Sequence, residues 1–324
     1  MGTSLGLRGR FSYTRTMFCR SGVDCFALAF QELTEAMRGQ EMAESEGQAW
    51  RPLAGIHVAT LATNLPGPAA AEQLCRLGAE VVKVEPPGGD PMARHCPSWY
   101  RALTSGQTVI SLDLKEASGF QKLEGLLPGT DLLLTSSRPA ALERLSLGWE
   151  RIHAKYSRLC QVALVGHAAP NEHIPGHDLT YQAGLGLVDP PQLPRTLMAD
   201  LASAERMVST GLALLLARER SGSGRYAQVS IVKVTEQFAQ PLRYGLTAPG
   251  GLLGGGKPGY QVYRASDGWI AIAALEPHFW QRLQAELKLE AANYEELGSR
   301  FLTRSATEWE RWAVERDLPV VAVR

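Results

Sequence analysis

The chain has 324 residues, enough to bury a sizeable core and to form one large and one small domain. Its 33 basic residues (Lys and Arg) equal its 33 acidic ones (Asp and Glu). The chain therefore lacks the positive net charge that would predict a nucleic acid or an anionic membrane as partner. No apolar run approaches the roughly 20 residues needed to cross a bilayer, and five scattered cysteines lack the spacing of a disulfide framework or zinc site. We therefore expect a cytoplasmic protein.

The first fifty residues differ in character from the rest of the chain. Four arginines precede the first acidic residue, Asp24: Arg8, Arg10, Arg15 and Arg20. Such a start weakly resembles a transit peptide and also occurs in unstructured extensions. We interpret residues 1–50 as an N-terminal extension and assign it no chemistry.

From residue 51 onward, short apolar stretches alternate with helical patterns. GIHVATLAT predicts a buried strand, Pro66-Gly67-Pro68 a turn, AAAEQLCRLG a helix capped at Gly78, and AEVVKVEPP the next strand. Further strands are expected in VISLDL, TDLLLTSS and RLCQVALVG, with a helix from Phe120 to Leu127. The alternation predicts an α/β fold: a Rossmann-like large domain with a parallel sheet over residues 51–235, then a smaller α+β domain over 236–324.

Three loops follow the carboxyl ends of the predicted strands, at residues 64–68, 85–94 and 136–139. Parallel sheets bind ligands at this edge, so we expect these loops to gather around a site. The chain has neither a GxGxxG nor a Walker motif, and the architecture alone therefore does not predict a nicotinamide enzyme or any other function.

Two stretches carry a specific resemblance. IPGHDLTYQAGLGL is followed by a helical segment that opens at LMAD and ends in the glycine-rich turn before YAQVSI, and LGGGKPGYQVYRASDGWIAIAALEPHFW comes later. In this order they resemble the family III CoA-transferases (CaiB/BaiF type), and within them most closely the alpha-methylacyl-CoA racemases. The resemblance covers residues 51 to 324 and implies an acyl-CoA-handling enzyme that acts as an interlocked homodimer, with coenzyme A as part of the substrate and no other cofactor.

The resemblance to the racemases places acid and base groups at His177, Asp200 and Glu276. Inverting a carbon next to a thioester needs one group to remove the proton and another to return one, roles that histidine and aspartate can exchange. Glu276 would orient the imidazole of His177. We expect backbone N–H groups after Met198 to bind the enolate oxygen.

The resemblance to the transferases points instead to Asp178, which matches the aspartate that forms covalent acyl and CoA intermediates there. Histidine before Asp178 and the presence of Glu276 favour the racemase. A third hypothesis is a non-catalytic CoA-binding subunit, because segment 103–108 carries no basic residue where members usually have them, and Thr196 replaces a supporting asparagine. Retention of the four candidate catalytic groups speaks against this third hypothesis.

Cations elsewhere in the chain are candidate partners for the CoA phosphates, since ammonium and guanidinium groups both suit phosphate: Lys83, Arg94, Lys115 and Arg138. By resemblance, Gly255 and Gly256 would form a backbone turn beside the thioester. His167 and His173 precede His177 without further ligand spacing, so no metal site is expected. Methyl-branched, aromatic and dicarboxylic acyl groups all stay open as substrates.

Overall fold

The computed structural model describes residues 50–324, so the predicted N-terminal extension lies, except for residue 50, outside the described residues. The described chain forms two compact units, residues 50–261 and 262–324. The domain boundary was expected between residues 235 and 236, but helix α10 (Ile231–Phe238) runs across that point. Its Val234 is buried in the core of the larger unit, and the helix therefore belongs to that unit.

The larger unit is built on a six-stranded parallel sheet in the order β3-β2-β1-β4-β5-β6. This confirms the α/β fold with a Rossmann-like sheet. The strand order reverses beside β1, whose neighbours are β2 and β4. In sequence order the strands are β1 (His57–Thr60), β2 (Glu80–Glu85), β3 (Thr108–Ser111), β4 (Leu132–Thr135), β5 (Cys160–Val165) and β6 (Tyr226–Ser230).

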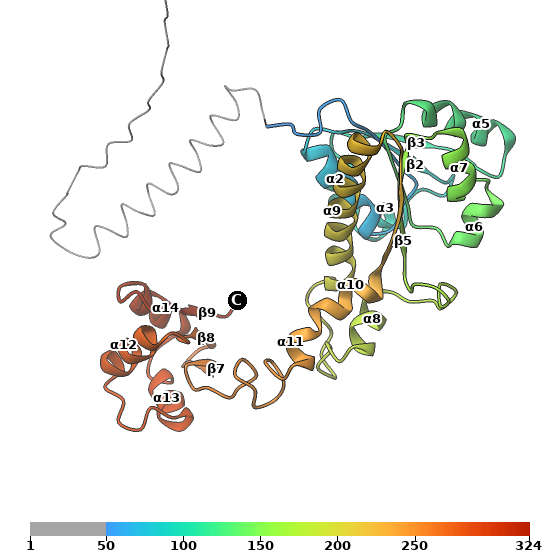
Figure 1. Ribbon diagram of the computed structural model, residues 1–324. Coiled ribbons are helices and arrows are strands. Elements are labelled where there is room, and N and C mark those ends of the chain that lie inside the picture. Colours follow the sequence, from blue (N-terminus) through green and yellow to red (C-terminus); the bar gives the residue numbers. More distant parts are fainter. Residues whose placement is uncertain (1–49) are drawn as a thin grey trace, which may run out of the picture. The chain divides into compact units, whose positions relative to one another are not determined.

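Helices cover both faces of this sheet, as the buried strands require. Alternate residues of β4 show the arrangement, since Leu132 and Leu134 enter one core and Leu133 the other. Figure 1 shows α2 and α9 along one face and α5, α6 and α7 along the opposite one. Their bounds are α2 (Pro66–Arg76), α9 (Met198–Ser221), α5 (Ala117–Leu126), α6 (Pro139–Arg144) and α7 (Trp149–Lys155).

Shorter helices occupy the connections: α3 (Pro91–His95), α4 (Pro97–Leu103), the 3₁₀ turn η1 (Leu127–Gly129), α8 (Asp178–Gly184) and α11 (Gln240–Arg243). The expected turn at residues 66–68 is instead the first turn of α2. Pro66 suits this position because its fixed φ is helical and the first helical N–H has no partner within the helix. The helix ends as expected before Gly78, whose φ is +102° and whose N–H donates to the Cys75 carbonyl at 2.9 Å.

The smaller unit contains a three-stranded sheet in the order β7-β8-β9 with three helices. Its core includes Ile270 and Ile272 of β8 together with Phe301, Trp309 and Trp312. The elements are β7 (Tyr260–Arg264), β8 (Trp269–Ala273), α12 (Pro277–Leu287), α13 (Tyr294–Phe301), α14 (Ala306–Val314) and β9 (Val320–Ala322). Throughout residues 50–324, every helix is too short or too polar to cross a membrane.

Candidate functional site

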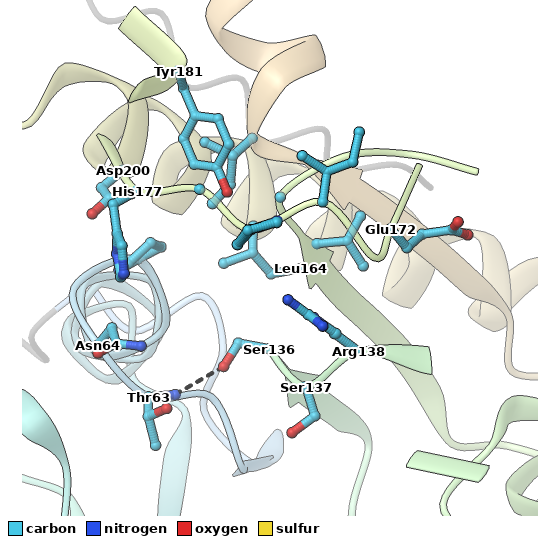
Figure 2. Close-up of a pocket in the computed structure, with 17 residues that line it drawn as sticks. Thr63, Asn64, Ser136, Ser137, Arg138, Leu164, Glu172, His177, Tyr181 and Asp200 are labelled. Carbon is cyan, nitrogen blue, oxygen red and sulfur yellow. Dashed lines mark hydrogen bonds between the residues drawn. The ribbon is translucent and has the colours of Figure 1, made fainter. Parts of the chain in front are cut away.

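A cavity of about 320 Å³ opens in the larger unit at the carboxyl ends of β1, β4, β5 and β6 (Figure 2). It lies where the strand order reverses, the position at which open parallel sheets bind ligands. Two of the three predicted loops line it, those following β1 and β4. The lining residues include Thr63, Asn64, Ser136, Ser137, Arg138, Glu172, His177, Tyr181 and Asp200.

His177 is the residue before α8 and lines the cavity. Its backbone is fixed by Thr180, whose hydroxyl accepts from the His177 N–H at 3.0 Å and donates to the His177 carbonyl at 2.8 Å. Gly176 precedes it because a Cβ there would overlap the ring of Tyr181. The triplet Gly176-His177-Asp178 thus holds an exposed imidazole at the cavity wall, while the ring of Tyr181 packs against that of His167.

Asp178 is buried, with 4% of its surface exposed, and both of its carboxylate oxygens accept hydrogen bonds. Oδ1 accepts from the backbone N–H of Asp200 at 3.1 Å, and Oδ2 accepts from Nε2 of Gln182 at 2.5 Å. Asp178 does not line the cavity. Its carboxylate ties the start of α8 to the first turn of α9.

Asp200 lies in the first turn of α9, as expected, and shares the cavity with His177. Burial raises the pKa of Asp200 from its ordinary 3.8 to about 6, the negative charge of Asp178 acts in the same direction, and His177 acts in the opposite direction. A carboxyl group with this pKa exchanges protons near neutral pH. His177 and Asp200 therefore share one cavity, in which the carboxyl group of Asp200 can act as an acid or a base.

The backbone donors expected for an enolate are partly in use. The Asp200 N–H donates to Asp178, and the Leu201 N–H donates to the Leu197 carbonyl at 3.0 Å. These two groups at the start of α9 are not available to a substrate oxygen, and the expectation stays a prediction for the remaining N–H groups of this helix end.

Two further hollows lie beside the cavity. The first hollow has a volume of about 530 Å³, and Ser137 and Arg138 line both it and the cavity. The second hollow has a volume of about 620 Å³, and Arg144 lines both hollows. Lys115 lines the second hollow. Residues common to neighbouring hollows thus link the cavity to a surface region that carries three exposed cations.

Lys83 is not available as a phosphate partner, and this prediction was wrong. Its side chain is 0% exposed, and Nζ lies 2.8 Å from Oδ2 of Asp90 and 3.1 Å from Oε1 of Glu85. Glu85 also accepts a hydrogen bond from the hydroxyl of Tyr100, and burial together with this bond raises the pKa of the phenol. These side chains form a buried charged cluster beneath the loop after β1.

The remaining candidates lie outside the three hollows. Arg94 is exposed, and its Nη1 donates to the Gly88 carbonyl at 2.8 Å. Gly255 has a φ of +91°, and the Gly256 N–H donates to the Gly251 carbonyl at 2.8 Å, so these glycines form a turn. Glu276 is exposed and belongs to the smaller unit, where it precedes α12.

Several cavity residues were not predicted from the sequence: Asn64, Ser136, Tyr181 and, in the adjoining hollows, Arg144. Asn64 and Ser136 fell within loops expected at the site, which was the available signal. Tyr181 follows the GHD triplet at helical spacing, yet it looks like an ordinary core aromatic residue. Within residues 50–324, no three His, Cys, Asp or Glu side chains are grouped as a metal site.

A sequence model described as CoA-transferase family III matches residues 53–324. The chain is 33% identical over 257 residues to the alpha-methylacyl-CoA racemase of Homo sapiens, across 74% of this chain and 65% of that protein. It is 31% identical over 258 residues to the succinyl-CoA–D-citramalate CoA-transferase of Chloroflexus aurantiacus, across 72% of this chain and 64% of that protein. The chain thus spans just under two thirds of either relative.

The solved structure of a hypothetical protein from Mycobacterium tuberculosis is also similar. It superposes with a TM-score of 0.73 at 26% identity, across 85% of this chain and 86% of that one. Sequence and fold therefore agree on one family, in which the relatives include both racemases and CoA-transferases.

Proposed function

The chain belongs to CoA-transferase family III, and from this premise we propose that it racemises 2-methylacyl-CoA thioesters by moving a proton at the α-carbon. One observation carries this choice: His177 and Asp200 line one cavity, whereas both carboxylate oxygens of the buried Asp178 already accept hydrogen bonds.

The proposed reaction divides the proton transfer between two side chains. Either His177 or Asp200 takes the α-proton, the electron pair of the C–H bond moves toward the thioester oxygen, and the other side chain returns a proton to the opposite face. The raised pKa of Asp200, about 6, suits both roles near neutral pH. Glu276 stays a proposed orienting partner of His177.

Coenzyme A would occupy the linked hollows beside the cavity. Arg138 lies at the junction, while Arg144 and Lys115 lie farther along, and exposed guanidinium and ammonium groups suit phosphates. This places the thioester at His177 and Asp200 and the nucleotide over α6. The basic residues missing from segment 103–108 would then be replaced by this group of cations.

The direct test is α-proton exchange of 2-methylbutanoyl-CoA in deuterated water. We expect His177→Ala and Asp200→Ala each to lower the exchange rate by about 10²- to 10⁴-fold, the usual contribution of a positioned acid or base. His95→Ala changes an exposed histidine of α3 outside the cavity and should exchange like the wild type. Exchange that survives both cavity substitutions would refute the proposed roles.

A CoA-transferase acting through Asp178 is the second candidate, favoured by the identity to the Chloroflexus transferase. The discriminating experiment gives the same protein an acyl-CoA and a free carboxylic acid acceptor, with Asp178→Asn as the matched variant. CoA transfer that depends on Asp178, without α-exchange by the wild type, would replace the racemase with the transferase. Binding of CoA with neither reaction would support the non-catalytic subunit.

The homodimer implied by the resemblance is also part of the proposal. Sedimentation equilibrium of the purified chain checks it, and a monomer at micromolar concentration would contradict it.

A further inference from the structure

The loop between β1 and α2 is held through several of its backbone groups. Oγ1 of Thr60 accepts from the Ala62 N–H at 3.2 Å, and Oγ of Ser136 accepts from the Thr63 N–H at 3.0 Å (Figure 2). Oδ1 of Asp90 accepts from the Asn64 N–H at 3.1 Å. The loop is therefore fixed by contacts from several segments and cannot easily shift.

The buried charged cluster supports this loop from below. Lys83 and Asp90 are both 0% exposed, and Nζ of Lys83 donates to Asp90 at 2.8 Å and to the Ala62 carbonyl at 3.4 Å. Asp90 in turn holds the Asn64 N–H. A fully buried ion pair thus sets the position of one residue at the cavity wall, Asn64.

Asn64 has a φ of +65°, a conformation in which Asn is several-fold enriched over most other residues. That preference explains the backbone but not the direction of the side chain. The carboxamide lines the cavity, and Figure 2 shows the imidazole of His177 directed toward it. Within residues 50–324 the carboxamide makes no hydrogen bond, so its N–H donors are open to a ligand.

The proposed proton transfer needs such a donor. Removal of the α-proton moves an electron pair onto the thioester oxygen, and a preorganised hydrogen bond stabilises the enolate. Two backbone N–H groups at the start of α9 are already used by Asp178 and Leu197. We propose that the Asn64 carboxamide donates a hydrogen bond to the substrate's thioester oxygen and stabilises the enolate, an inference that rests on the proposed function.

Asn64→Gly tests this inference because glycine adopts the same positive φ and removes only the side chain. Asn64→Asp keeps the shape and replaces the donor by a carboxylate. We expect kcat for α-exchange of 2-methylbutanoyl-CoA to fall by about 10²- to 10³-fold in Asn64→Gly, as for other oxyanion donors, and further in Asn64→Asp. Free CoA should bind both variants and the wild type alike in calorimetry.

Asn171→Gly is the matched control, since Asn171 is an exposed loop asparagine that lines none of the three hollows. It should exchange at the wild-type rate. Wild-type kcat in Asn64→Gly, full activity in Asn64→Asp, or a fall in kcat matched by lost CoA binding would overturn the inference alone. A wild-type protein without exchange would instead overturn the proposed function, and this inference with it.

Discussion

Asp200 belongs to the candidate site, and its buried carboxylate lowers the stability of the folded protein near neutral pH. Its pKa is raised to about 6, first by burial and then by the charge of Asp178. A raised folded-state pKa means that the folded protein holds the proton more tightly than the unfolded chain does. Stability contributed by this group is therefore present at low pH and is lost as the pH rises from about 4 through about 6.

Asp200→Asn removes the buried charge while keeping the side chain's shape. Because one pKa unit corresponds to about 1.4 kcal/mol and the pKa rises by roughly two, we expect the variant at pH 7 to be more stable to unfolding by about 3 kcal/mol. Urea denaturation at pH 7 and at pH 3.5 measures the change, and the difference should vanish at the lower pH. Asp189→Asn, an exposed loop acid, is the control, and an Asp200→Asn protein no more stable than this control would contradict the expectation.

The same pKa predicts the pH dependence of the reaction when Asp200 acts as the base. Only its carboxylate form accepts a proton, so the exchange rate should fall about tenfold per pH unit below pH 6. A profile of kcat/KM for α-exchange between pH 4.5 and 8 measures this. If the fall in kcat/KM below pH 6 persists unchanged in Asp200→Asn, another group is responsible for it.

At the scale of the elements, the alternation of strands and helices was predictable, because strands buried on both faces are continuous apolar runs. The buried charged cluster around Lys83, beneath the loop after β1, could not be predicted directly, since the sequence of a strand does not show whether its lysine is buried or exposed. A signal does exist: Lys83 interrupts the apolar run VVKVE, and Asp90 follows seven residues later. The donor role of Asn64 needed the loop's conformation, which depends on contacts from Asp90 and Ser136.

The Lys83–Asp90 pair should contribute strongly to stability. Asp90→Asn leaves a fully buried ammonium group with only Glu85 as a charged partner, and breaking a buried pair costs about 3 to 5 kcal/mol. Chemical denaturation measures this loss. Glu124→Gln breaks the exposed pair with Lys155 and should leave the midpoint nearly unchanged. Equal midpoints for the two variants would argue against the supporting role of the cluster.

At the scale of the whole molecule, the two units have separate hydrophobic cores. The boundary was predicted too early because α10 and the segment after it carry no composition shift that marks them as part of the larger unit. His177 and Asp200 belong to one unit and Glu276 to the other, a division that agrees with the linear order of the motifs.

Separate cores predict separate responses to mutation. Trp309 is 2% exposed, contacts Phe301 and Trp312 edge-to-face, and donates from Nε1 to the Phe301 carbonyl at 2.8 Å. Trp309→Ala should destabilise the smaller unit by about 3 to 5 kcal/mol. Hydrogen exchange should speed up in α12 to α14 and stay unchanged in β4 and β5. Leu302→Ala, at an exposed position, is the control, and faster exchange in β4 would show that the cores unfold together.

The carboxylate of Asp178 also constrains how this protein can diverge. The same group that a transferase would use as a nucleophile here closes the beginning of α9 and sets the position of Asp200. A descendant that freed Asp178 for covalent chemistry would need a new acceptor for the Asp200 N–H, or the position of Asp200, the proposed proton carrier, would change. Gain of one chemistry is thereby coupled to loss of the other, and the evolutionary route between them passes through a change at the junction of α8 and α9.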